Sequence, residues 1–137
     1  MTEHLIRVET RVVLGARRAL EKGRGAKPSI WDPLQKLTYW SGLASLVRVR
    51  TMGGLDPAND PPAQMALAGQ LERLASARAA TAAFVAEVRE RDLTRIWLRH
   101  PFFGAFRVPD MLGWVAWHED RHRRQMERIL HRVRPHD

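Results

Sequence analysis

The amino-acid sequence predicts an all-α protein that folds as a four-helix bundle in a single domain, residues 1–137. Hydrophobic residues recur at steps of three and four over several long segments, and this spacing places them on one side of a helix. No segment alternates hydrophobic and polar residues over the length of a strand. Glycines and prolines separate the periodic segments, and four helices with one short and two longer connections are typical of a bundle.

The first two helices have clear boundary signals in the sequence. The first is predicted over residues 2–21, and it ends at the glycines of a Lys-Gly-Arg-Gly turn. The second is predicted over residues 31–50, with Asp32 as its N-cap. Its Leu34 and Leu37 are expected to face the core.

The second half of the chain contains the two longest predicted helices. A loop rich in proline and glycine, residues 52–62, leads to an alanine-rich third helix over residues 62–90. Residues 91–108 are expected to form an irregular, aromatic-rich connection that folds over one end of the bundle. The fourth helix is predicted over residues 109–133, since Pro109 suits a first helical turn.

The composition excludes several classes of function. The chain has no cysteine, which rules out disulfides, thiolate zinc sites and cysteine nucleophiles, and it favours the cytoplasm. We expect no signal peptide and no membrane-spanning segment. The net charge of +8 suggests a basic, DNA-associated protein as one hypothesis. The arginines of the last helix alternate with acidic residues, however, which favours a solvent-exposed helix face.

The polar residues of the fourth helix carry the main functional signal. Its inward stripe is predicted to run through Met111, Val115, His118, His122, Gln125, Ile129 and Val133. Residues four apart on a helix differ by about 40° in direction, so the imidazoles of His118 and His122 can converge on one point. Neutral imidazoles bind zinc, nickel, iron or copper. The alternative is a buried pair that hydrogen bonds satisfy without a metal.

The same region resembles a known family. The relevant runs are His-Pro-Phe-Phe-Gly from residue 100, Met-Leu-Gly-Trp-Val from residue 111 and the segment 118–129, with a weaker likeness at residues 31–37. They resemble the DinB-like (YfiT-like) superfamily. The resemblance implies an up-down-down-up four-helix bundle with a longer crossover connection, often a homodimer. It also implies a divalent metal bound by three histidines, one on the second helix and a pair on the fourth.

The resemblance places the histidine pair on His118 and His122, and it places the position of the third histidine on Tyr39. A metal can lower the pKa of a tyrosine enough for phenolate binding, and the fold could instead bring His4 or His100 to the site. For His100, which precedes a proline, the competing interpretation is a structural hydrogen-bonding residue.

Two classes of function follow from these observations. The first is a divalent-metal-dependent enzyme, a thiol transferase or hydrolase with zinc or nickel and a small-molecule or thiol substrate, as the resemblance implies. The second is a non-catalytic dimeric scaffold or binding protein without a metal, in which the two histidines persist as a buried polar pair. Catalytic carboxylates are not evident, because Glu119 and Asp120 point away from the histidine stripe.

Overall fold

The computed structural model describes residues 2–23, 25–40 and 66–133, without the side chains of residues 38–40. These residues are mostly helical, as predicted, and they also contain two short strands. In chain order the elements are α1 (Thr2–Glu21), α2 (Asp32–Trp40), α4 (Leu67–Glu87), β1 (Trp97–His100), β2 (Gly104–Arg107) and α5 (Val108–Val133). The rest of the expected second helix and the loop after it lie outside the described residues.

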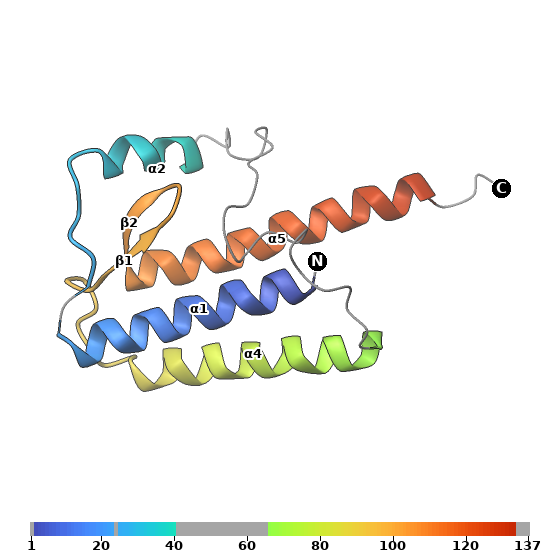
Figure 1. The fold of residues 1–137 in the computed structure, drawn as a ribbon, viewed down its shortest axis with the longest axis horizontal. Coiled ribbons are helices and arrows are strands. Elements are labelled where there is room, and N and C mark those ends of the chain that lie inside the picture. The colour runs from blue at the N-terminus through green and yellow to red at the C-terminus, as the bar shows by residue number, and fades with distance from the viewer. Residues whose placement is uncertain (1, 24, 41–65, 134–137) are drawn as a thin grey trace.

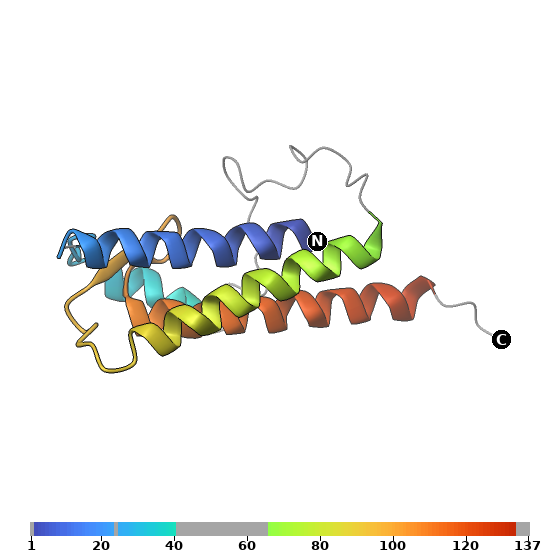
Figure 2. The same cartoon turned by 90° about the horizontal axis from the view of Figure 1, so that it is seen from below.

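Three long helices, α1, α4 and α5, form the body of the molecule. Helix α1 lies between the other two and packs against both (Figure 1). The view from below shows α4 crossing at an angle to α5 (Figure 2). The central position of α1 explains why it buries more residues than either neighbour, including small residues such as Ala16 and Ala19 that allow close packing.

The core has two hydrophobic clusters along α1. One contains Val8, Phe103, Phe106, Met111, Trp114 and Val115, and the other contains Val13, Ala16, Ala19, Phe84, Val88, Leu93, Ile96 and Val108. The aromatic residues before α5 therefore fill the core instead of forming an exposed patch. The first cluster packs beside the N-terminal half of α1, and it supports the part of α5 that carries the two histidines.

The prediction of an irregular connection over residues 91–108 was wrong for its second half. Strands β1 and β2 pair antiparallel there, with Trp97 opposite Arg107 and His100 opposite Gly104. Gly104 has a φ of +76°, a left-handed conformation that favours glycine. Strands of only four residues give too short a pattern for sequence periodicity to detect.

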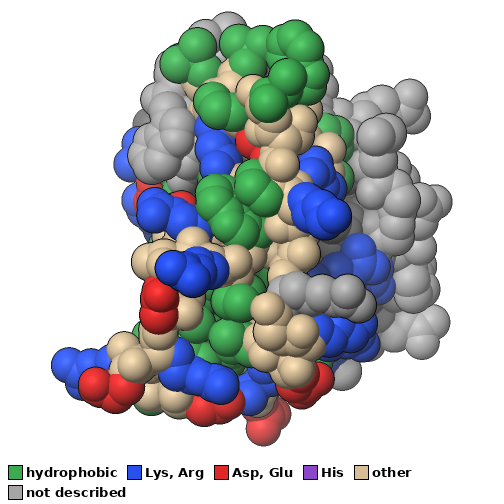
Figure 3. Space-filling model, turned by 90° about the vertical axis from the view of Figure 1, so that its left-hand side faces the viewer, with side chains coloured by type: hydrophobic (Ala, Val, Ile, Leu, Met, Phe, Trp, Pro, Cys, Tyr) green, Lys and Arg blue, Asp and Glu red, His purple; other side chains and the backbone are tan. Residues whose placement is uncertain are grey.

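The expectation that Leu34 and Leu37 of α2 face the core was also wrong. Leu34 is 60% exposed and Leu37 is 61% exposed. Ile30 and Trp31, just before the start of α2, are exposed too. Exposed hydrophobic side chains therefore gather over α2 (Figure 3). Helix α2 rests on the hairpin through other residues, among them the buried Asp32.

The predicted inward stripe of α5 holds only for its N-terminal part. Met111 and Val115 are buried, whereas Ile129 and Val133 near the C-terminal end are exposed. Figure 1 shows the reason, because α5 continues beyond the ends of its neighbours α1 and α4. Among the described residues, no helix combines the length and the apolar character that crossing a membrane requires.

Candidate metal centre

Two helices bring three histidines together. His4 lies in the first turn of α1, and His118 and His122 lie one turn apart in the middle of α5. The four-residue spacing places the two α5 histidines on the same side of the helix. Because α1 packs along α5, the start of α1 comes to lie opposite them.

The three side chains converge through the same ring atom. The Nε2 atom of His118 lies 3.3 Å from Nε2 of His4 and 3.2 Å from Nε2 of His122. One ligand atom from each of the three rings lies within 4.8 Å of the other two. His4 is buried, with 5% of its surface exposed, and His118 and His122 are partly buried.

A bound metal accounts for this convergence better than hydrogen bonding does. A ring nitrogen of a neutral histidine carries either one proton or one lone pair, so Nε2 of His118 would have to share that one proton or lone pair between Nε2 of His4 and Nε2 of His122. A metal ion accepts a lone pair from all three rings. Two nitrogens at about 2.0–2.1 Å from a tetrahedral zinc ion lie about 3.3 Å apart, which agrees with both measured separations. The three residues therefore fit a divalent metal.

The surroundings keep the α5 histidines uncharged at neutral pH. The pKa of His118 is lowered to about 3, mainly by burial and in addition by the neighbouring histidines and Arg121. Burial also lowers the pKa of His122 from its ordinary value. Neutral imidazole is the form that binds metal ions, so the lone pairs at Nε2 are available.

Two further side chains orient the rings. Trp114 stacks on His118, with 4.9 Å between the ring centres. The Nδ1 atom of His122 lies 3.2 Å from Oε1 of Gln125, an oxygen that only accepts a hydrogen bond. The proton of neutral His122 is thereby held at Nδ1, and its Nε2 lone pair points to the other histidines.

His100 does not join this group. Its Nδ1 accepts hydrogen bonds from the backbone N–H groups of Phe102 and Phe103, at 3.1 and 3.2 Å, and its ring packs 4.4 Å from Trp114. It is a structural residue of the hairpin turn. The backbone of Tyr39 lies in α2, but its side chain is outside the described residues, so its predicted role stays a prediction.

Sequence reasoning missed a second polar group beside the histidines. The carboxyl of Glu9 on α1 is buried, and it faces Glu119 of α5 and Thr81 of α4. Burial raises the pKa of Glu9, and the Glu119 carboxylate raises it further. Glu119 in turn pairs with Arg78 of α4 at 2.8 Å. These residues link the three long helices and do not contribute to the three-histidine group.

The fold and the site define a class of protein: a helical protein with a three-histidine group between its first and last described helices. The family model of the DinB superfamily matches residues 1–126, and the chain belongs to this superfamily. A search of curated proteins found no match. A search of the solved structures found none either.

Proposed function

We propose that the protein is an enzyme that depends on a divalent metal ion, zinc or nickel, held by His4, His118 and His122. The convergence of three Nε2 atoms from two helices carries this proposal. Membership of the DinB superfamily agrees with it. A set of three neutral imidazoles is a ligand set that zinc and nickel accept.

The reaction we propose is a transfer to a thiol or a hydrolysis, with a small molecule as substrate. A divalent metal held by three protein ligands would keep one coordination position open. It would lower the pKa of a water or thiol bound in that position. The protein's own residues present the three nitrogens, fix the protonated atom of His122 through Gln125 and hold the ring of His118 against Trp114.

The proposal competes with a non-catalytic scaffold in which hydrogen bonds alone satisfy the histidines. In that case Gln125 would accept a hydrogen bond from His122. Nε2 of His118 would still have two nitrogen neighbours, Nε2 of His4 and Nε2 of His122, and only one proton or one lone pair to share between them. We therefore favour the metal-dependent enzyme.

Metal titration of the full chain after removal of bound metal tests the proposal. Calorimetry should show one equivalent of zinc or nickel bound to the wild type, and His4→Ala and His122→Ala should each weaken the affinity by about 100-fold or more. His131→Ala is the matched control, because His131 is exposed near the end of α5 and lies outside the group. Its metal affinity should equal that of the wild type.

Thermal denaturation gives a second readout that does not require a substrate. A metal at a concentration 100 times its dissociation constant should stabilise the wild type by about 2.7 kcal/mol. Binding that is insensitive to His4→Ala would remove the three-histidine centre from the proposal. A wild type that binds neither metal would contradict the proposed function altogether.

A further inference from the structure

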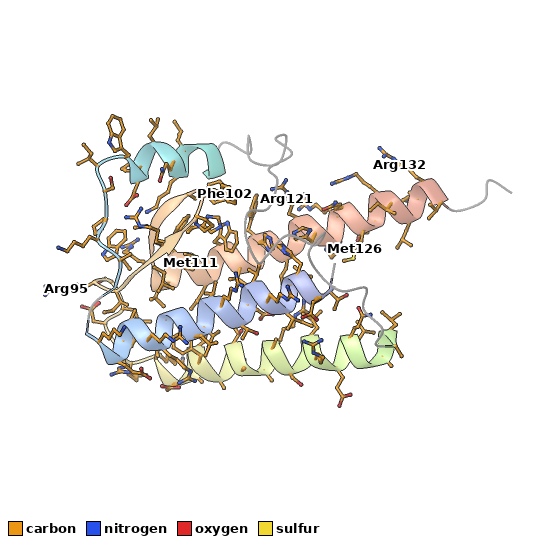
Figure 4. All side chains as sticks on the ribbon, viewed as in Figure 1. Arg95, Phe102, Met111, Arg121, Met126 and Arg132 are labelled. Atoms are coloured by element: carbon orange, nitrogen blue, oxygen red, sulfur yellow. The ribbon has the colours of Figure 1, made fainter. Side chains whose placement is uncertain are left out.

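One arginine occupies an unusual position beside the three histidines. Arg121 follows His118 by three residues and Trp117 by four, so all three share one side of α5. Its guanidinium carbon lies 5.8 Å from the centre of the Trp117 ring. Figure 4 shows Arg121 rising from α5 on the side of the molecule where α2 and the hairpin lie.

No carboxylate in the described part of the chain forms a salt bridge with Arg121. Its neighbour Asp120 is engaged by Arg123 and Arg124, each at 2.8 Å. Within residues 2–23, 25–40 and 66–133, the other arginines are either exposed or paired with an acidic side chain. Arg121 alone is partly buried and has no salt bridge there.

The charge of Arg121 also lies close to the histidines, because Arg121 follows His118 by three residues and directly precedes His122 in α5. Partial burial strengthens the electrostatic effect of this charge, because water screens it less. An anion that binds Arg121 therefore lies within electrostatic reach of the proposed metal site.

The chemistry of the side chain indicates what it binds. A guanidinium is planar and always charged, and its N–H donors match the two oxygens of a carboxylate or phosphate. The Trp117 ring limits the positions that the group samples, which reduces the entropy lost when a ligand binds. Residues three apart on a helix have Cβ atoms about 5–6 Å from each other, so the anion would lie a few bonds from a group held at His118.

We propose that Arg121 binds an oxyanion, a carboxylate or a phosphate, of the same substrate whose reacting group is held at the three histidines. The inference rests on the proposed metal-dependent function and narrows its substrate class. The substrate is then a small anionic molecule, with its charged group a short distance from its reacting thiol or other metal-binding group.

Thiol binding to the cobalt-loaded full chain tests this inference. Cobalt(II) absorption reports occupancy of the metal site, and a thiolate bound to cobalt adds a charge-transfer band in the near ultraviolet. The probes are mercaptoacetate and 2-mercaptoethanesulfonate, whose oxyanions are planar and tetrahedral, with uncharged 2-mercaptoethanol for comparison. Wild type should bind at least one charged thiol about tenfold more tightly than 2-mercaptoethanol, and the better probe identifies the kind of oxyanion.

The variant Arg121→Gln should lose this preference and keep the wild-type affinity for cobalt and for 2-mercaptoethanol within about twofold. Arg132→Gln is the matched control, because it removes the same charge from the exposed end of α5 (Figure 4). It should retain the preference. A preference that survives in Arg121→Gln would show that the metal, not the guanidinium, holds the oxyanion, and would overturn the inference.

The remaining outcomes separate this inference from the proposed function. If cobalt binds but no thiol binds, or all three thiols bind equally well to the wild type, the role of Arg121 is overturned and the metal site stands. If cobalt does not bind at the histidines, both proposals fall together.

Discussion

His100 connects the protonation of the protein directly to its stability. Its Nδ1 accepts hydrogen bonds from the backbone N–H groups of Phe102 and Phe103. A protonated imidazolium could not accept these hydrogen bonds, because both of its ring nitrogens carry a proton. Burial lowers the pKa of His100 from 6.5 to about 4. The geometry and the pKa shift agree, since both favour the neutral ring.

The sign and size of the effect follow from linkage. Between pH 6.5 and about pH 4, the unfolded chain binds a proton at His100 that the folded chain does not bind. The free energy of unfolding therefore falls as the pH falls below 6.5. At pH 5.0 the loss from this residue amounts to about 2 kcal/mol, at about 1.4 kcal/mol for each pH unit below 6.5.

The substitution His100→Asn isolates this contribution. The asparagine oxygen can replace Nδ1 as the acceptor for the hairpin turn, and the side chain does not titrate. Urea unfolding with EDTA present, at pH 7.5 and pH 5.0, measures the stability without bound metal. The variant should be less stable at pH 7.5 because it loses the ring contacts with Phe103 and Trp114.

The decisive quantity is the difference in stability between the two pH values. His118 titrates in both proteins, so its contribution cancels when the wild type and the variant are compared. The stability lost on acidification should be about 2 kcal/mol smaller in His100→Asn than in the wild type. An equal loss in the two proteins would refute the reasoning.

Two further substitutions test the described packing by chemical denaturation. Gly104→Ala should destabilise the protein by about 1–2 kcal/mol or more, because φ is +76° and the new Cβ would meet Oδ1 of Asp32, whereas Gly113→Ala on the open face of α5 should be neutral or stabilising. Burial raises the pKa of Glu9, so the contribution of this residue to the stability should fall as the pH rises above 4.5. Glu9→Gln should remove this contribution, so the stability of the variant relative to the wild type should increase as the pH rises, and a difference that does not change with pH would contradict the assignment.

The part of the site that sequence could predict is the part that lies on one helix. A four-residue spacing fixes the relative direction of two side chains whatever the helix packs against, so His118 and His122 could be paired from the sequence alone. The amphipathic pattern of α1 and the membership of the DinB superfamily were likewise accessible from the sequence.

The parts that sequence could not predict depend on long-range packing. The exposure of Leu34 and Leu37 depends on where α2 comes to rest, and the short hairpin depends on pairing between Trp97 and Arg107. Local preference is overridden in both cases by tertiary contacts. The homodimer and the cytoplasmic location stay predictions.

His4 shows where the limit of sequence reasoning lies. It precedes Val8 by four residues and so lies on the buried side of α1, as His118 does on α5. The sequence names His4 only as one alternative for the third ligand, beside Tyr39 and His100. It could not choose among them, because 114 residues separate His4 from His118 along the chain and only the packing of α1 against α5 joins the two. A centre built from two helices also ties metal binding to that packing, whereas a pair on one helix would bind metal whether or not α1 was in place.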